Sequence, residues 1–204
     1  LLRHKVPFPK TGFADSKDDF ENICKTIGGA PLVLKLLEGT EGTGVFLVDD
    51  IKFAENIKAT CKQFDTPILV QEFISESKGN DLRCFVVGEK VVATMKRESQ
   101  DGDFRANVSL GGHSTSEELS AEEEEIAINA AKAIGLHVAG VDMIRSNKGA
   151  LIIEINVSPD FCGEQGIESV TGVDVAGAII DYAVQSKKEY DNGEGVWLQS
   201  AAAT

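Results

Sequence analysis

The chain has 204 residues and a formal net charge of −13, from 33 acidic and 20 basic side chains. Apolar residues make up 42% of it, enough for the core of one large domain or two small ones, which excludes a disordered or low-complexity chain. The acidic balance argues against direct binding to nucleic acid, and no apolar run approaches a membrane span. The first residues lack the features of a signal peptide, so we expect a cytoplasmic protein, and the opening Leu1 suggests a missing upstream segment.

The first third of the chain predicts a small β/α unit. Apolar residues at helical spacing indicate a helix over residues 16–27, and a compact apolar run over 31–37 that holds one lysine indicates a strand. The other elements of this unit are a strand over 45–48, a helix capped by Asp50 over 51–63, and a buried strand over 67–74.

A second unit follows a polar break at residues 75–80. Residues 82–87 and 90–96 flank Gly88-Glu89, a two-residue hairpin signal, and the polar stretch 99–116 is expected to be a loop. Ser120 and Glu123 form a capping box for a helix over 120–134. The remaining elements are strands over 138–145 and 150–156, an amphipathic helix from Val175 to about Val184, and a tail over 191–204.

The cysteines and histidines form no recognisable site. Because the four cysteines contain no C-x-x-C pair, reduced thiols in a core are expected, with a disulfide or metal role as the alternative. The three histidines are isolated, which argues against histidine-centred hydrolysis.

Residues 38–44, Glu-Gly-Thr-Glu-Gly-Thr-Gly, are a first candidate for phosphate binding. Glycines allow successive backbone N–H groups to point at one anion. The loop enters a strand, so it is neither a P-loop nor a dinucleotide fingerprint, and a plain glycine-rich hairpin is the alternative. Lys35 favours phosphate binding, because a lysine in a buried strand usually has an anionic partner; the alternative is an edge-strand lysine that faces water.

The strongest cluster is Asp142, Glu154 and Asn156 on two apolar strands. Glu154 and Asn156 share one face of their strand, and the register decides whether Asp142 joins them. An odd loop, such as 147–149, places Asp142 opposite Glu154, whereas an even loop places it on the other face. Two carboxylates and an amide suit Mg²⁺ shared with phosphates; the alternative is three polar residues on a solvent-facing side.

Arg97, Arg105 and Asn107 are candidate donors to a transferring phosphate. Arg105 and Asn107 share a face if the chain is extended there, on a loop able to close over a nucleotide. Ordinary surface positions are the alternative for all three.

Taken in order, these segments resemble the ATP-grasp superfamily, and within it the RimK-type ligases, which add glutamate to the C-terminus of a ribosomal protein. The resemblance rests on Lys35, residues 38–44, Val-Gln-Glu-Phe-Ile at 70–74, Gly-Asp-Phe-Arg-Ala-Asn at 102–107, Val141-Asp142, and Glu-Ile-Asn-Val-Ser-Pro at 154–159. It covers residues 1 to about 187. Asp160, where relatives often have glycine, and the segment 161–166 depart from the pattern and bear on the acceptor.

The resemblance implies an α+β protein of the ATP-grasp fold, in which two α+β subdomains, residues 1–73 and 74–190, clasp ATP between them and residues 191–204 form a tail. Family members also carry an N-terminal domain that this sequence lacks, which leaves the acceptor site incomplete. The implied site residues are grouped by role. The phosphates would be held by Lys35, Glu38, Gly39, Gly42 and Gly44, the adenine by Glu72 and Phe73, and the ribose by Asp81. Arg97, Arg105 and Asn107 would face the phosphates or an acyl phosphate, with Arg97 and Arg105 catalytic. Asp142, Glu154 and Asn156 would hold metal ions, Mg²⁺ or Mn²⁺, two in number.

The expected function is therefore an ATP-dependent carboxylate–amine ligase whose partners are ATP, glutamate and a ribosomal protein tail, and which forms a homo-oligomer when full length. Such chemistry needs positioning and charge neutralisation and no protein nucleophile. The alternatives are a related ligase acting on a small cofactor or an amino-acid carrier protein, a nucleotide-binding module without catalysis, and a purely structural domain.

Overall fold

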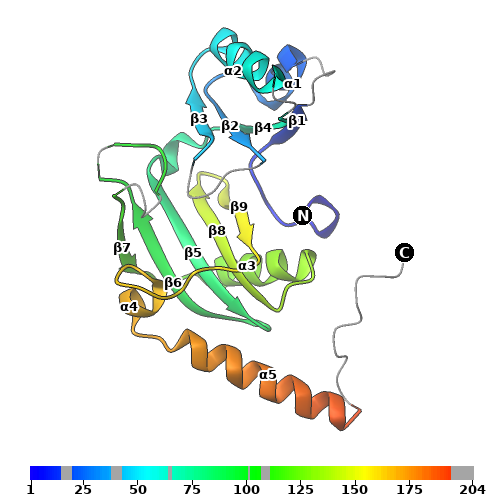
Figure 1. The fold of residues 1–204 in the computed structure, drawn as a ribbon, viewed down its shortest axis with the longest axis vertical. Helices are drawn as coiled ribbons and strands as arrows, with labels where there is room; N and C mark the ends of the chain where they lie inside the picture. Colours follow the sequence, from blue (N-terminus) through cyan, green and yellow to red (C-terminus); the bar gives the residue numbers. More distant parts are fainter. Residues whose placement is uncertain (15–19, 38–42, 64–65, 101, 107–110, 194–204) are drawn as a thin grey trace.

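The computed structural model describes residues 1–14, 20–37, 43–63, 66–100, 102–106 and 111–193. It contains two antiparallel sheets, one small and one large, that lie one above the other with the chain crossing between them (Figure 1). Helices cover the outer face of the small sheet and both faces of the large one. The protein is therefore α+β, as the sequence predicts.

The small sheet has four strands in the order β1-β4-β2-β3. Its strands are β1 (Thr11–Ala14), β2 (Leu32–Leu36), β3 (Val45–Val48) and β4 (Ile68–Glu72). Helices α1 (Phe20–Ile27) and α2 (Ile51–Gln63) pack on one face, where Leu32, Leu34 and Val70 are fully buried. Because side chains alternate along a strand, Val33 and Lys35 project from the opposite face, toward the large sheet.

The large sheet has five strands in the order β7-β6-β5-β8-β9. They are β5 (Asn80–Val87), β6 (Lys90–Glu98), β7 (His113–Ser116), β8 (Val138–Ser146) and β9 (Gly149–Asn156). Helix α3 (Ala121–Ala133) packs on one face through its alanines. On the other face, α4 (Ile167–Thr171) and α5 (Val175–Asp191) cover only one end, where Phe85 and Val87 lie. The other end of that face carries charged side chains.

Most predicted elements are confirmed. Val45–Val48 and Ile51–Gln63 match the expected bounds, Asp50 Oδ1 accepts a hydrogen bond from the N–H of Lys52 at 3.3 Å, and the hairpin turn is at Gly88-Glu89. The expectation of a loop over residues 99–116 is wrong at its end, because His113–Ser116 pairs with β6 as an edge strand. The last helix is longer than its apolar stripe and continues to Asp191. Most of the predicted tail, residues 194–204, lies outside the described residues.

The first residues contact the large sheet. A short 3-10 helix, η1 (Leu2–His4), precedes Val6, which is buried in the core between the large sheet and α3. The carbonyl of Pro7 accepts a hydrogen bond from the N–H of Ile152 at 2.9 Å. The chain therefore enters along the large sheet before it builds the small one, although the sequence groups residues 1–73 together.

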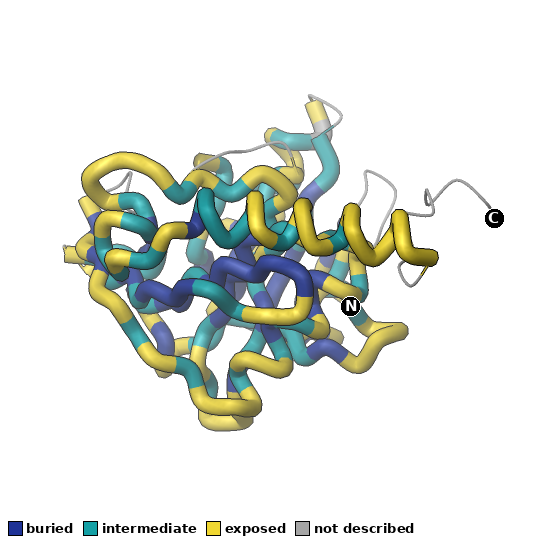
Figure 2. Tube along the Cα trace, turned by 90° about the horizontal axis from the view of Figure 1, so that it is seen from below, coloured by how far each residue is buried: buried dark blue, intermediate teal, exposed yellow. Residues whose placement is uncertain are grey.

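Helix α5 is the most exposed of the long elements. Figure 2 shows it running along the outside of the molecule, with exposed positions over most of its length. Ile180 and Val184 are exposed, whereas Val175 at its start is fully buried. No described helix is long and apolar enough to cross a membrane. All four cysteines lie in the described part: Cys24 and Cys84 are buried as expected, whereas Cys61 is half-buried and Cys162 is exposed, so the expectation of core positions is wrong for these two.

The predicted capping box begins α3. Ser120 Oγ accepts a hydrogen bond from the N–H of Glu123 at 3.2 Å, and Glu123 Oε2 accepts one from the N–H of Ser120 at 2.9 Å. Arg145 of β8 donates to Glu123 Oε1 from Nε at 2.6 Å. These hydrogen bonds, that from Arg145 foremost, lower the pKa of Glu123.

Glu123→Gln is expected to lower the melting temperature by about 2–4 °C at pH 7, because it removes the charge that Arg145 pairs with. A carboxylate whose pKa is lower in the folded state stabilises the fold above its unfolded pKa of about 4.3 and loses that contribution as the pH falls through the folded value. The difference from wild type should therefore shrink as the pH is lowered from 5 to 3. Glu122→Gln, an exposed neighbour, is the control; the same pH dependence in both variants would contradict the assignment.

Candidate active site

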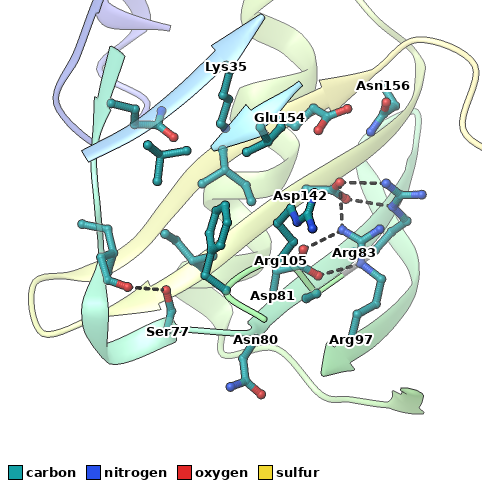
Figure 3. A pocket seen from close by; sticks show the side chains of 18 of the residues that line it. Lys35, Ser77, Asn80, Asp81, Arg83, Arg97, Arg105, Asp142, Glu154 and Asn156 are labelled. Atoms are coloured by element: carbon teal, nitrogen blue, oxygen red, sulfur yellow. Dashed lines mark hydrogen bonds and ion pairs between the residues drawn. The ribbon is translucent and has the colours of Figure 1, made fainter. Parts of the chain in front are cut away.

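A cavity of about 850 Å³ lies between the two sheets. The inner face of the small sheet contributes Val33, Lys35 and Gln71 to it, and the charged end of the large sheet contributes Asp81, Arg83, Arg97, Asp142 and Glu154. Phe73 and Ile74, in the segment that connects the sheets, form part of its wall. The structure thus brings predicted site residues from distant parts of the chain into one space (Figure 3).

Four charged side chains form a continuous network on the floor of this cavity. Arg97 pairs with Asp81 through two hydrogen bonds, Nε to Oδ1 at 2.6 Å and Nη2 to Oδ2 at 2.8 Å. Its Nη2 also lies 3.0 Å from Asp142 Oδ2. Arg83 donates to both oxygens of Asp142, from Nε at 2.8 Å and from Nη2 at 2.7 Å. Figure 3 shows the chain of contacts from Asp81 through Arg97 and Asp142 to Arg83.

The network is nearly closed to solvent. Asp142 is 2% exposed, Arg97 4% and Asp81 8%. Burial works to raise the pKa of Asp142, but the Arg97 and Arg83 guanidinium groups outweigh it and lower that pKa below its ordinary value. Asp81 has one guanidinium partner, and there burial prevails and raises the pKa. The difference between the two aspartates follows from the number of arginines that each contacts.

A β-bulge sets the register of the metal candidates. The turn between β8 and β9 has two residues, since Ser146 pairs with Gly149, so of the two cases that the sequence left open the loop is the even one. A regular ladder from that turn would pair Asp142 with Ile153 and place Glu154 on the other face. The register shifts after the pair Met143 and Ile152, and Asp142 then lies opposite Glu154. The extra residue of a bulge thus restores the facing that the cluster needs.

Lys35 comes down from the small sheet toward these carboxylates (Figure 3). Burial lowers the pKa of its ammonium group, and the charges of Glu154 and Asp142 partly offset this. Within the described part of the chain, Lys35 forms no direct ion pair. A half-buried ammonium near carboxylates but bonded to none is suited to an anionic ligand that enters between the sheets.

Asp142, Glu154 and Asn156 have the donor chemistry of a hard-cation site. Glu154 is exposed to the cavity, and the Nδ2 atom of Asn156 is buried without a hydrogen-bond partner among the described residues. Amide oxygen and nitrogen are assigned from their partners, so an unpaired buried amide is available to a ligand. A carboxylate accepts at about four lone-pair positions, and the two arginines occupy three on Asp142. The described residues hold no group of three His, Cys, Asp or Glu side chains that could bind a metal, and the Asn156 side-chain oxygen is a further ligand of the type that hard cations accept.

Aromatic side chains and a loop anchor close one side of the cavity. The rings of Phe73 and Phe104 meet edge to face, with centroids 6.3 Å apart. Gly79 holds the loop that carries Phe104: its N–H donates to the Phe104 carbonyl at 3.1 Å, and a Cβ there would lie 2.7 Å from the Asp103 carbonyl oxygen. Arg105 lines the cavity and is paired with Asp103, with Nη2 to Oδ2 at 2.8 Å.

Of the other residues predicted to contact the nucleotide, some lie within the described part of the chain and some outside it. The Glu72 carboxylate accepts a hydrogen bond from the N–H of Lys10 at 2.8 Å, so this side chain braces the entering chain at the cavity wall. Gly44 has a φ of 81° and its carbonyl accepts from the N–H of Leu36 at 2.9 Å, which closes the hairpin between β2 and β3. Glu38, Gly39, Gly42 and Asn107 lie outside the described residues.

The structure gives more precise places to residues outside the predicted site set. The sequence suggested Arg83 only as part of a local basic pocket with Lys96, Arg97 and Arg105; the structure places it on the same face of β5 as Asp81, bonded to Asp142. Asp160, Cys162 and Gln165 line the cavity beyond the end of β9. These three residues belong to the stretch 160–166, which the sequence analysis singled out because it departs from the expected family pattern.

Comparison with known families agrees with the ATP-grasp resemblance of the sequence. The model of the RimK-like ATP-grasp domain matches residues 1–183. The chain belongs to the RimK-like ATP-grasp family. It is 53% identical over 188 residues to a probable alpha-L-glutamate ligase of Legionella pneumophila and 49% identical over 188 residues to one of Coxiella burnetii, covering 92% of this chain in each case. The chain spans 61% and 62% of the lengths of these relatives.

Solved structures confirm the ATP-grasp fold. The D-alanine–D-alanine ligase of Bacillus anthracis complexed with ATP matches with a TM-score of 0.70 at 20% identity, over 96% of this chain and 65% of that one. The ATP-grasp ligase PsnB complexed with its minimal precursor matches with a TM-score of 0.68 at 22% identity, over 90% and 57% of the two chains. At these identities the likeness establishes the fold alone.

Proposed function

We propose that this RimK-like ATP-grasp chain is the nucleotide-binding and catalytic part of an ATP-dependent carboxylate–amine ligase that adds L-glutamate to the C-terminus of a ribosomal protein. The observation that carries the proposal is the cavity in which Lys35 on one sheet faces Asp142 and Glu154 on the other. The names of the relatives as probable alpha-L-glutamate ligases support the choice of glutamate.

ATP would lie between the two sheets, in the proposed subdomains 1–73 and 74–190, although the first residues of the chain pack on the large sheet. Its adenine would lie against the segment of Glu72 and Phe73, where an aromatic wall and backbone groups are available. The phosphates would lie near Lys35 and the β2–β3 hairpin at Gly44, and Glu38, Gly39 and Gly42, which precede Gly44 in the sequence, are proposed to help hold them. Asp81 would contact the ribose at the edge of its ion pair with Arg97. Arg105 and Asn107 would donate to phosphate oxygens from the loop beside Phe104.

Asp142, Glu154 and Asn156 would hold Mg²⁺ or Mn²⁺, two ions in all, because carboxylate and amide oxygens suit hard cations. A bound divalent ion supplies charge neutralisation at the transferring phosphate. Glu154 is well placed for this because it is exposed to the cavity, whereas the Asp142 carboxylate is already held in a fixed orientation by two arginines.

The reaction would proceed through an acyl phosphate. The carboxylate of the acceptor attacks the γ-phosphorus of ATP and ADP leaves; the amino group of glutamate then attacks the acyl carbon and phosphate leaves. The side chains position the reactants and neutralise charge, and no protein nucleophile is required. Lys35 and Arg105 would donate hydrogen bonds to the phosphate oxygens. Arg97, which the resemblance assigns to the phosphates as a catalytic residue, is buried and bonded to Asp81 and Asp142, and would act by holding these two carboxylates in position. The full-length protein would act as a homo-oligomer.

The acceptor is tested by incubating the full-length protein with ATP, Mg²⁺, glutamate and candidate acceptors, followed by mass spectrometry. We expect ADP formation that depends on the acceptor and a series of glutamate additions on a ribosomal protein tail. Labelling confined to a small cofactor or an amino-acid carrier protein would replace the ribosomal acceptor and leave the ligase chemistry. Tight nucleotide binding without turnover on any acceptor would contradict the ligase and favour a binding module.

A further inference from the structure

Arg83 differs from Arg97 in how firmly it is held. Arg97 is bonded to Asp81 as well as Asp142, and its side chain is 5% exposed. The Arg83 side chain is 17% exposed and lines the cavity, and among the described residues both of its hydrogen bonds go to Asp142. Of the two arginines, Arg83 is therefore the one that can leave Asp142 without leaving another buried carboxylate unpaired.

The pairing of Arg83 uses the carboxylate that a cation would need. Arg83 occupies one lone-pair position on each oxygen of Asp142, and Arg97 occupies a further one on Oδ2. A divalent ion bound beside Asp142 and Glu154 would thus lie close to a guanidinium group, and two like charges at that distance repel strongly in a half-buried cavity. The ion and Arg83 compete for one anion.

We propose that Arg83 is a positioning residue that serves as the counter-cation of Asp142 while the metal site is empty, and that a divalent ion displaces at least one of its two hydrogen bonds. This rests on the proposed function, because it assumes that Asp142 is a metal ligand. The Arg83–Asp142 pair gives the buried carboxylate a counter-charge and a fixed orientation without a metal. When the ion binds, the freed guanidinium lies in the cavity as a donor to an anionic substrate, which couples metal binding to substrate binding.

The first test is the affinity of the full chain for Mn²⁺ in the presence of saturating ADP, measured by the loss of the free Mn²⁺ signal in electron paramagnetic resonance. Arg83→Gln should bind Mn²⁺ about tenfold more tightly than wild type, because a competing positive charge is gone while Arg97 still holds Asp142. Arg83→Lys, which keeps the charge, should stay within about threefold of wild type. Arg145→Gln is the matched control: it removes an arginine that is also bonded to a carboxylate through Nε and Nη2, but outside the cavity, and should leave the affinity unchanged.

A second measurement uses the wild-type chain, so it does not depend on whether an Arg83 variant folds. The Nε–H resonance of Arg83 in the wild-type chain, bonded to Asp142, should shift and exchange faster with water when Mg²⁺ is added to the ADP complex. The Nε–H resonance of Arg145 should not change. An Arg83 resonance that is unaffected while Mg²⁺ binds would overturn the proposal.

The outcomes separate this inference from the function on which it rests. If wild type binds neither ADP nor Mn²⁺ at millimolar concentration, the ligase proposal fails, and the role of Arg83 fails with it. If wild type binds both but Arg83→Gln binds Mn²⁺ equally or more weakly, only the displacement of Arg83 is wrong and the nucleotide site stands.

Discussion

Replacing Arg97 by methionine should lower the free energy of unfolding by about 3–5 kcal/mol, among the largest losses that a single substitution in this chain can produce. Arg97 is the only described guanidinium bonded to Asp81, and it is the buried link between Asp81 and Asp142. Asp81 is only 8% exposed, so removal of Arg97 leaves a buried carboxylate without its bonded counter-charge. Urea unfolding followed by circular dichroism measures the loss.

Two further variants and the pH dependence of Arg97→Met identify the mechanism of that loss in stability. Asp81→Asn combined with Arg97→Met should be less destabilised than Arg97→Met alone, because no unpaired carboxylate is left. Arg145→Met should cost far less, since that arginine and its partners keep contact with water. In Arg97→Met the pKa of Asp81 rises further above its unfolded value, so the variant should gain stability relative to wild type as the pH falls. A variant as stable as wild type would show that the network contributes no net stability.

The sequence predicts the strands and helices of this protein better than it predicts contacts between them. Hydrophobic spacing and capping residues are local signals, so Ile51–Gln63 and the capping box at Ser120 are predicted closely. His113–Ser116 has no apolar alternation, because this edge strand contributes hydrogen bonds to β6 and little side-chain burial. Local patterns contain no signal for such a strand.

The facing of Asp142 and Glu154 shows where prediction of the site reached its limit. Counting along the hairpin gives the correct pair only if the loop is odd, and the loop is even. The bulge at Ile153 compensates, and nothing in the apolar run Leu151-Ile152-Ile153 distinguishes one isoleucine as the extra residue. Likewise, spacing places Asp81 and Arg83 on one face, but only the neighbouring strands reveal that Arg97 separates the two aspartates. Pairing between strands depends on the whole sheet, which is why residue types were predictable and their partners were not.

Glu154→Gln should reduce acceptor-dependent ADP release at least about 10³-fold while leaving the melting temperature within about 2 °C of wild type. Glu154 is exposed to the cavity and forms no ion pair with the described residues, so the fold does not depend on its charge. Its proposed role, to hold a divalent ion beside the transferring phosphate, does depend on that charge. Glu154→Gln should therefore lose activity and keep its stability, whereas Arg97→Met should lose stability.

The loss in Glu154→Gln should arise at the metal and leave nucleotide binding in place. Calorimetry in the absence of divalent ions should give an ADP affinity close to that of wild type, whereas Mn²⁺ binding to the ADP complex should be strongly weakened. Glu125→Gln is the matched control, an exposed glutamate on α3 that does not line the cavity, and it should retain full turnover. Turnover near wild type in Glu154→Gln would remove this residue from the metal set. Because the bulge at Ile153 serves to bring Glu154 opposite Asp142, that result would also leave the bulge without a functional reason.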